Sequence, residues 1–463
     1  MSRPSTTRAR NSPLSFAQSR IWLLNQISGP DPQYNVPIVV RPRGGIDADA
    51  LQAALHDVVS RHEILRTLYQ VIDGDVVQIV RQPEDIQGLL SVENHSEPLR
   101  EARVAEVSTY TFSLDTETPL RAWLLSSDSA DDVVVVVAHH IAVDGSSLVP
   151  LLRDLGTAYA ARRDLAEPRW DSLPLQYGDF AVWQRGYLGD SADPDSLSGR
   201  QLAYWRATLA QLPMEIELPV DRPRPAVADF SGGNIVIPIS AELHRRVVEV
   251  ARAERMAPFT VFHAAIAAFL GRSGAGSDIP LGGFVNGRTD AALDDLVGFF
   301  VNTLVFRVDI AGDPTFRELL RRAAKAEIDA YSHQDLPFDM IVRDLKLARS
   351  STRHPLVQTA ISYEDADLAT LRIPGLNAEV EIGEHGRAKF DVYVRYLARR
   401  DAAGEPAASA MNWRYATALF DASTIEPMAG GLVAFLGSAL ADIDRCVAEI
   451  PADVQVCAVP EPS

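Results

Sequence analysis

Hydrophobic residues along the chain follow two periodicities that alternate over its length. From Asp47 onward apolar residues recur at helical spacing, with Asp47 or Asp49 as a suitable N-cap, and these residues are Ala50, Leu51, Ala54, Leu55, Val58 and Val59. Residues 133–137 are five consecutive valines, apolar on both faces, which is typical of a strand in the middle of a covered sheet. Helical and strand patterns are mixed in both halves and no repeat of about 20 to 50 residues is visible, so the pattern predicts two layered α/β lobes.

Proline-rich and polar segments interrupt this pattern on either side of an aromatic helix. The segments are "AEPRWDSLPLQ" and "GDSADPDSLSG", and the helix between them is "YGDFAVWQRGYL". Such segments are typical of the boundary between two lobes. We therefore expect a flexible leader at 1–12, an N-terminal lobe at 13–178, a C-terminal lobe at 179–450 and a flexible tail at 451–463.

Composition and charge narrow the classes of function. The 463 residues include 44 basic and 62 acidic side chains, a net charge of −18, which opposes broad contact with nucleic acid or an anionic membrane. No apolar stretch approaches the about 18 residues of a membrane span, and the start lacks the apolar core of a signal peptide, so we expect a cytoplasmic protein. Cys446 and Cys457 are too few for a disulfide framework and are expected to be inert thiols.

Two adjacent histidines follow the valine run. His139, His140, Asp144 and Gly145 lie between the predicted strand and a predicted helix whose apolar positions begin at Leu148. Neighbouring residues of a strand point to opposite faces, so the two imidazoles cannot face the same cavity in the same way, and one of them is expected to be structural. Gly145 suits either a positive φ or a close approach of the backbone to a ligand.

The residues alone leave three interpretations of this loop open. A neutral imidazole could act as a general base or hydrogen-bond partner in an attack on an acyl group. The two histidines and Asp144 could bind a metal, but the histidines diverge and no nearby side chain completes the set. They could also be a pair of core histidines. Ser146 or Ser147 could serve as a nucleophile, although capping of the following helix explains these serines more simply.

Eight motifs in order along the chain resemble the condensation domains of nonribosomal peptide synthetases. His139–Gly145 matches the HHxxxDG signature of this family. The other motifs, spread between Leu14 and Gln358, are "LSFAQSRIWLL", "RHEILRT", "YGDFAVWQ", "NGRTD", "VGFFVNTL", "HQDLPFD" and "RHPLVQ". The resemblance covers nearly the whole chain and implies two lobes similar to chloramphenicol acetyltransferase, arranged as a V-shaped pseudo-dimer with a central tunnel.

The resemblance also implies a role for each residue of the loop. His140 occupies the catalytic position and would face the tunnel, whereas His139 would turn into the fold. Asp144 would pair with Arg288 and hold the loop, and the backbone of Gly145 would lie close to the reacting thioester. Whether His140 removes a proton or orients the amine stays open, since an α-amine with a pKa near 8 is already partly neutral at cellular pH.

The implied reaction is peptide-bond formation. The amine of a carrier-bound acceptor aminoacyl group would attack the thioester of a carrier-bound donor. The implied partners are donor and acceptor peptidyl carrier proteins and neighbouring synthetase domains, and the isolated domain is expected to be monomeric. No metal or redox cofactor is implied for the domain itself, and the phosphopantetheine arms belong to the carriers.

The sequence departs from the family pattern near the loop. Ser146 stands where the family often has tryptophan, and "GGFVNGRTD" replaces the commoner "GTPVAGRTD", which is expected to bring Phe284 and Asn286 close to the active-site loop. These differences could reshape a substrate pocket or reflect neutral drift in a packing shell. The intact HHxxxDG motif argues against a heterocyclising domain, and the surrounding stretches most resemble domains that take a D-configured donor and an L-configured acceptor.

Two other functions remain as alternatives. The same fold could be a noncatalytic platform that recruits another enzyme, although related noncatalytic domains have a degraded HHxxxDG motif. It could also be a stand-alone acyltransferase that uses a soluble amine or a coenzyme A thioester.

Overall fold

The computed structural model describes residues 11–127, 130–227, 229–346, 352–365, 373–383 and 386–451, and the chain forms two compact units. The first unit holds the described residues up to Leu197, together with Asn286–Val301 and the described part of Leu368–His385. The second unit holds the rest. This partition differs from the continuous lobes expected from the sequence, because two later segments return to the first unit.

The expected leader and tail fall mostly outside the described residues. Asn11–Pro13, at the end of the expected leader, forms strand β1 and pairs with β4 (Asp75–Val80). Expectations for residues 1–10 and 452–463 lie outside the described part of the chain. A strand thus starts within the segment that the sequence pattern assigns to the flexible leader.

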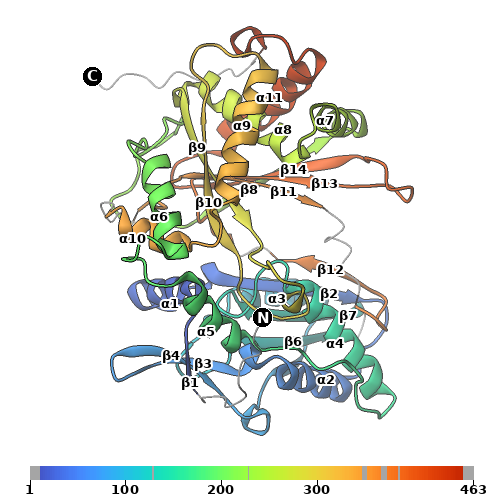
Figure 1. Ribbon diagram of the computed structural model, residues 1–463. Helices are drawn as coiled ribbons and strands as arrows, with labels where there is room; N and C mark the ends of the chain where they lie inside the picture. The colour runs from blue at the N-terminus through green and yellow to red at the C-terminus, as the bar shows by residue number, and fades with distance from the viewer. Residues whose placement is uncertain are drawn as a thin grey trace. The chain divides into compact units, whose positions relative to one another are not determined.

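A five-stranded sheet with the order β12-β2-β7-β6-β5 organises the first unit (Figure 1). Its strands are β2 (Asn35–Pro42), β5 (Leu90–Asn94), β6 (Leu120–Ser127), β7 (Ala130–His139) and β12 (Ala378–Ile382). The helices of this unit are α1 (Phe16–Ser28), α2 (Ala48–Arg61), α3 (Glu97–Ser108), α4 (Leu148–Arg163) and α5 (Tyr177–Leu188). Helix α3 packs on β6 and β7, and α2 packs on α4. The small sheet β1-β4-β3 adds β3 (Thr67–Ile72).

Strand β7 lies at the centre of this sheet, as the valine run predicts. It pairs antiparallel with β2 on one side and with β6 on the other. All five valines from 133 to 137 are at most 3% exposed, which confirms a strand covered on both faces. The prediction for α2 is also confirmed, since the carboxylate of Asp47 accepts the Ala50 N–H at 2.9 Å and every predicted apolar position is buried.

A six-stranded sheet with the order β10-β9-β11-β13-β14-β8 organises the second unit. Its strands are β8 (Gly232–Ile239), β9 (Asp278–Val285), β10 (Asn302–Asp309), β11 (Thr359–Asp365), β13 (Val392–Ala398) and β14 (Ser409–Ala416). Its helices are α6 (Leu197–Thr208), α7 (Ala241–Glu254), α8 (Pro258–Leu270), α9 (Phe316–Tyr331), α10 (Phe338–Asp344) and α11 (Ala422–Ala441). Helix α8 contacts α7, α9 and α11, so these four helices form one packed layer.

Helix α11 departs from the expectation that no apolar stretch approaches the length of a membrane span. Among the described helices it alone is long and apolar enough to cross a membrane by length and composition. Half of its apolar window is buried, and Ile425, Leu432 and Phe435 belong to the core of the second unit. This packing is what a core helix of a folded domain shows.

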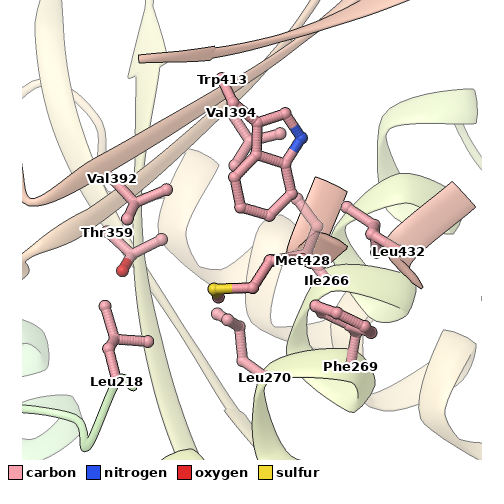
Figure 2. Close-up of a pocket in the computed structure, with 10 residues that line it drawn as sticks. All are labelled: Leu218, Ile266, Phe269, Leu270, Thr359, Val392, Val394, Trp413, Met428 and Leu432. Carbon is pink, nitrogen blue, oxygen red and sulfur yellow. The ribbon is translucent and has the colours of Figure 1, made fainter. Parts of the chain in front are cut away.

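An apolar pocket lies in the core of the second unit (Figure 2). It is lined by Leu218, Ile266, Phe269, Leu270, Thr359, Val392, Val394, Trp413, Met428 and Leu432. Thr359 Oγ1 and Trp413 Nε1 are buried and have no hydrogen-bond partner within the described residues. The lining offers no acid, imidazole or thiol, so the candidate catalytic chemistry lies elsewhere.

Candidate functional site

The end of β7 positions both histidines through its pairing with β2. His139 is the last residue of β7 and lies opposite Asn35, and the His140 N–H donates to the Tyr34 carbonyl at 2.7 Å. The backbone then turns, because the Ala142 N–H donates to the carbonyl of His139. The loop that follows ends where α4 begins at Leu148. This order of strand, tight loop and helix is the one predicted from the sequence.

His139 points into the fold. It is 1% exposed, and its ring packs edge-on against Phe112 at 5.8 Å and lies 6.4 Å from the ring of Tyr34. Its Nδ1 accepts the Ile141 N–H at 3.1 Å. A ring nitrogen that accepts carries no proton, so the proton of the neutral ring sits on Nε2. The Nδ1 lone pair of His139 is thus used in a hydrogen bond to the backbone of the loop.

His140 is half-buried and holds the opposite tautomer. Its Nδ1 lies 3.0 Å from the carbonyl oxygen of Val143. A carbonyl oxygen can only accept, so Nδ1 carries the proton and the lone pair of the neutral ring is on Nε2. The ring of Phe299 lies 5.7 Å from that of His140, at an interplanar angle of 58°. His140 therefore has the proton arrangement that a general base or a hydrogen-bond acceptor requires.

Asp144 is committed to structural contacts. It is 2% exposed, its Oδ1 accepts the Ser147 N–H at 2.8 Å, and the same oxygen lies 2.8 Å from the Ser147 hydroxyl. Its Oδ2 accepts the Phe300 N–H at 2.8 Å. Nη2 of Arg288 lies 3.4 Å from Oδ1, which places the two charges of the expected pair together. Both oxygens of the carboxylate are thus occupied by contacts that hold the loop.

Arg288 joins the same network from the segment 286–301. Its Nη2 donates to Ser147 Oγ at 2.8 Å, its Nη1 donates to the Leu293 carbonyl, and its guanidinium lies 4.2 Å from the centre of the Phe300 ring. The side chain is buried with Asp144. A buried guanidinium that contacts both an aromatic face and a carboxylate stabilises the position of the segment that carries it.

Gly145 does not adopt the positive φ that was one of its two expected explanations. Its φ is not positive, and a Cβ added at this position would have no neighbouring atom within 4 Å. The residue is exposed. The other explanation, an approach of a ligand to the backbone, is compatible with this exposure.

The three residues expected near a substrate pocket lie in different surroundings. Ser146 is half-buried beside Gly145. Asn286 is exposed, and its Oδ1 accepts the Arg288 N–H at 3.1 Å. Phe284 belongs to the second unit, where its ring packs edge-on against Phe390 and Tyr393. Asn286 thus adjoins the network of Arg288, whereas Phe284 is part of an aromatic cluster of the other unit.

Sequence reasoning missed the role of Ser147 and Tyr177. Ser147 is the N-cap of α4, but its side chain makes no capping hydrogen bond. Its hydroxyl instead contacts Gly298, at 2.6 Å to the carbonyl oxygen and 3.0 Å to the nitrogen. The Tyr177 hydroxyl lies 2.5 Å from the Phe299 carbonyl. Gly298 and Phe299 lie in the motif "VGFFVNTL" and Tyr177 begins the motif "YGDFAVWQ", but neither motif indicates which residues are in contact.

The geometry bears on the three interpretations of the loop. Burial in the core applies to His139 and not to His140. In the part of the chain that the structure describes, no three His, Cys, Asp or Glu side chains converge as metal ligands would. The half-buried imidazole of His140, with a defined tautomer and in a loop that the buried charges of Asp144 and Arg288 hold, is the candidate chemical group.

Comparison with known proteins gives a consistent result. The family model of the condensation domain matches residues 8–452. The chain is 43% identical to part of the nonribosomal peptide synthetase CymA of Salinispora arenicola, over 95% of this chain and 6% of CymA. It is 42% identical to part of the dimodular nonribosomal peptide synthase of Bacillus subtilis, over 96% of this chain and 19% of that protein. The chain therefore spans a small part of these relatives.

A solved structure resembles the chain over nearly its whole length. The X-domain from teicoplanin biosynthesis, in a complex with OxyB, superimposes with a TM-score of 0.89 at 32% identity. The match covers 98% of this chain and 99% of the X-domain.

Proposed function

Because the chain belongs to the condensation-domain family of nonribosomal peptide synthetases, we propose that it forms a peptide bond between two carrier-bound acyl groups. The observation that carries this proposal is the tautomer of His140, whose Nδ1 proton is held by the Val143 carbonyl. The lone pair on Nε2 can accept a hydrogen bond from an attacking amine. His139 cannot substitute, because its Nδ1 is bound to the loop and its ring is buried.

In the proposed reaction the acceptor amine attacks the carbonyl carbon of the donor thioester. A C–N bond forms, the C–S bond breaks, and the thiol of the donor arm leaves. One proton passes from the amine nitrogen to the leaving sulfur, and Nε2 of His140 either carries this proton or only orients the amine that loses it. The phosphopantetheine arms come from the carriers, and tethering of both substrates supplies much of the rate enhancement.

The finer assignments belong to the same proposal. The partners are donor and acceptor carrier proteins and neighbouring synthetase domains, the donor is D-configured and the acceptor L-configured, and the reaction takes place in the cytoplasm. Gly145 leaves its backbone open to the thioester, since a Cβ there would meet no neighbour. Ser146 and Asn286 border the loop and are candidates to contact the acceptor side chain.

Reconstituted condensation tests this function. Carrier proteins loaded with donors of D and L configuration and with one L acceptor are mixed with the protein, and the dipeptidyl product is measured by mass spectrometry. We expect product with the wild type, faster with the D donor, and loss of product in His140→Ala. A matched control is His95→Ala, which removes a partly exposed imidazole paired with Glu93 in the same unit. Equal rates for both donors would overturn the donor assignment, and full activity of His140→Ala would overturn the mechanism.

A second candidate function is a platform that binds another enzyme. The similarity to the X-domain found in a complex with OxyB supports it. A platform predicts no product from any carrier-bound pair, and binding of a partner enzyme that survives His140→Ala. The ordered tautomer of His140 favours the catalytic proposal, because a platform has no need of it.

A further inference from the structure

The imidazole of His140 and the backbone of its loop close a ring of atoms. Nδ1 of His140 lies 3.0 Å from the carbonyl oxygen of Val143, so the backbone of Ile141 and Ala142 forms part of this ring. Rotation of the peptide between Ile141 and Ala142 would move the Val143 carbonyl relative to Cα of His140, and with it the imidazole. The position of the imidazole therefore depends on how the Ile141 carbonyl is held.

Gln18, in the first turn of helix α1, holds this carbonyl. Its side chain is fully buried, and its Nε2 donates to the Ile141 carbonyl oxygen at 3.1 Å. The orientation of the carboxamide is defined, because Gln18 Oε1 accepts the backbone N–H of Ser15 at 3.0 Å and only the oxygen can accept. Both protons of Nε2 therefore face away from the start of the helix and toward the loop.

Two other buried side chains complete the cluster around this amide. Gln78 Oε1 lies 3.3 Å from Gln18 Nε2, and Nε2 of Gln78 donates to the Pro13 carbonyl at 2.9 Å. The Tyr69 hydroxyl lies 3.1 Å from Gln18 Nε2 and 3.5 Å from the Ile141 carbonyl oxygen. Removal of the Gln18 amide would leave the Ile141 carbonyl with only this longer contact among the described residues, and a buried carbonyl that loses its donor moves to find another.

The same turn of α1 also holds a second segment beside the loop. Ser15 Oγ accepts the Gln18 N–H at 3.1 Å and lies 2.9 Å from the Tyr177 hydroxyl. The Tyr177 hydroxyl in turn lies 2.5 Å from the Phe299 carbonyl oxygen, which can only accept. The capping box of α1 thus holds two backbone carbonyls, those of Ile141 and Phe299, from one place in the fold.

We propose that Gln18 is a positioning residue for His140 and acts on it through the Ile141 peptide. The inference rests on the proposed function, because its predicted effect is on amide formation. Gln18 is fully buried and does not meet the acyl groups itself. The proposal gives a role to the motif "LSFAQSRIWLL", in which Gln18 lies and to which the proposed reaction assigns none.

Gln18→Met tests the proposal, since methionine has a similar length but neither donates nor accepts as an amide does. We expect kcat for condensation to fall about 10- to 100-fold, because a misplacement of about 1 Å has effects of this size. The KM for both loaded carriers should stay within about 2-fold, since this buried amide takes no part in their binding.

The matched control is Gln78→Met, which removes a second buried amide from the same cluster. It breaks the contacts of Gln78 with Pro13 and Gln18 but leaves the bond from Gln18 to Ile141 in place. Urea unfolding should show a similar loss of stability in both variants, whereas kcat of Gln78→Met should equal that of the wild type. An equal loss of kcat in the two variants would overturn the proposal, because it would indicate a general effect of lost buried amides.

Gln18→Glu takes the place of Gln18→Met if that variant does not fold. Its carboxyl still accepts the Ser15 N–H, so the capping box is kept. It offers at most one proton where the amide offers two, and Ile141 and Gln78 compete for it. A smaller loss of kcat than in Gln18→Met is expected, and a kcat equal to that of the wild type would overturn the positioning role.

Amide hydrogen exchange without substrate separates this inference from the proposed function. Carbon-13 isoleucine and nitrogen-15 alanine labels select the three Ile–Ala peptides of the chain, which are Ile141–Ala142, Ile266–Ala267 and Ile310–Ala311. The Ala142 N–H donates to the His139 carbonyl at 2.9 Å, so its exchange reports opening of the turn.

We expect faster exchange of Ala142 in Gln18→Met than in the wild type or Gln78→Met, with Ala267 of helix α8 as the internal reference. An unchanged rate at Ala142 in Gln18→Met would overturn the positioning role. Absence of condensation in the wild type would instead overturn the proposed function and leave the exchange result intact.

Discussion

The imidazole of His140 donates its Nδ1 proton to the carbonyl oxygen of Val143 at 3.0 Å. The preceding residue does the reverse, because Nδ1 of His139 accepts a backbone N–H. Two adjacent histidines therefore carry opposite tautomers, and this follows from the turn of the backbone between them. The lone pair suited to proton transfer is on Nε2 of His140, the less buried of the two histidines.

Separate effects are expected when each histidine is removed. His140→Ala should lower amide formation about 100- to 10,000-fold, the range of general base catalysis, with little change in stability. His139→Ala should lower the free energy of unfolding by about 2 to 4 kcal/mol, because it leaves a cavity and an Ile141 N–H without its acceptor. Urea unfolding and the condensation assay measure the two effects. Similar losses of stability in both variants would contradict this division.

Asp144 and Arg288 should behave as a coupled buried pair. Their side chains are 3% and 4% exposed, so removal of either by alanine should cost about 3 to 5 kcal/mol of stability. Asp144→Ala should cost more, since it also releases Ser147 and the Phe300 N–H. A double-mutant cycle by urea unfolding should show that the double variant loses less than the sum of the two. Strict additivity would mean that the pair does not interact.

Stability should fall in mild acid because of His62. This residue is 1% exposed, and its Nε2 lies 2.9 Å from Asp154 Oδ2. The pKa of His62 is lowered from its ordinary value, because the effect of burial is larger than the opposing effect of the hydrogen bond to Asp154. The unfolded state has the ordinary pKa near 6.5, so below about pH 6.5 it binds more protons than the folded state. The free energy of unfolding therefore decreases as the pH falls below that value.

His62→Gln removes this titration. The difference in urea unfolding free energy between the wild type and His62→Gln should shrink between pH 8 and pH 5. Parallel curves over this range would show that His62 does not contribute to the pH dependence.

The buried pair His263 and Glu327 should respond differently to single and double replacement. Nδ1 of His263 lies 2.8 Å from Glu327 Oε1, the side chains are 0% and 6% exposed, and Nε2 of His263 has no partner in the described part of the chain. Glu327→Ala should cost about 3 to 5 kcal/mol, because His263 and Thr260 lose their common partner. His263→Phe combined with Glu327→Leu should be close to neutral or stabilising by about 1 to 4 kcal/mol. Thermal unfolding of the wild type, Glu327→Ala and the double variant measures these differences in stability. A double variant less stable than Glu327→Ala would contradict the prediction.

Elements whose burial is local could be predicted from the sequence. The valine run forms part of β7, and the apolar residues at helical spacing after Asp47 form the buried face of α2. Both could be predicted because the periodicity of apolar residues within a segment decides which face of that segment is buried. The alternation of a strand likewise separates His139 from His140. The family follows from ordered motifs, each of which is a continuous stretch of the chain.

Contacts between distant segments were decided only by the tertiary structure. Strand β12 pairs with β2, with Val380 opposite Val40, through backbone hydrogen bonds that carry no side-chain signal in either segment. Ser146 or Ser147 was expected to cap α4, and Ser147 is the N-cap, but its hydroxyl binds Gly298 because a buried hydroxyl bonds to the polar groups that the fold brings near it. The sequence by itself thus determined that the two histidines stand at the end of a buried strand, and the tertiary structure decided that the ring of Phe299 lies beside that of His140.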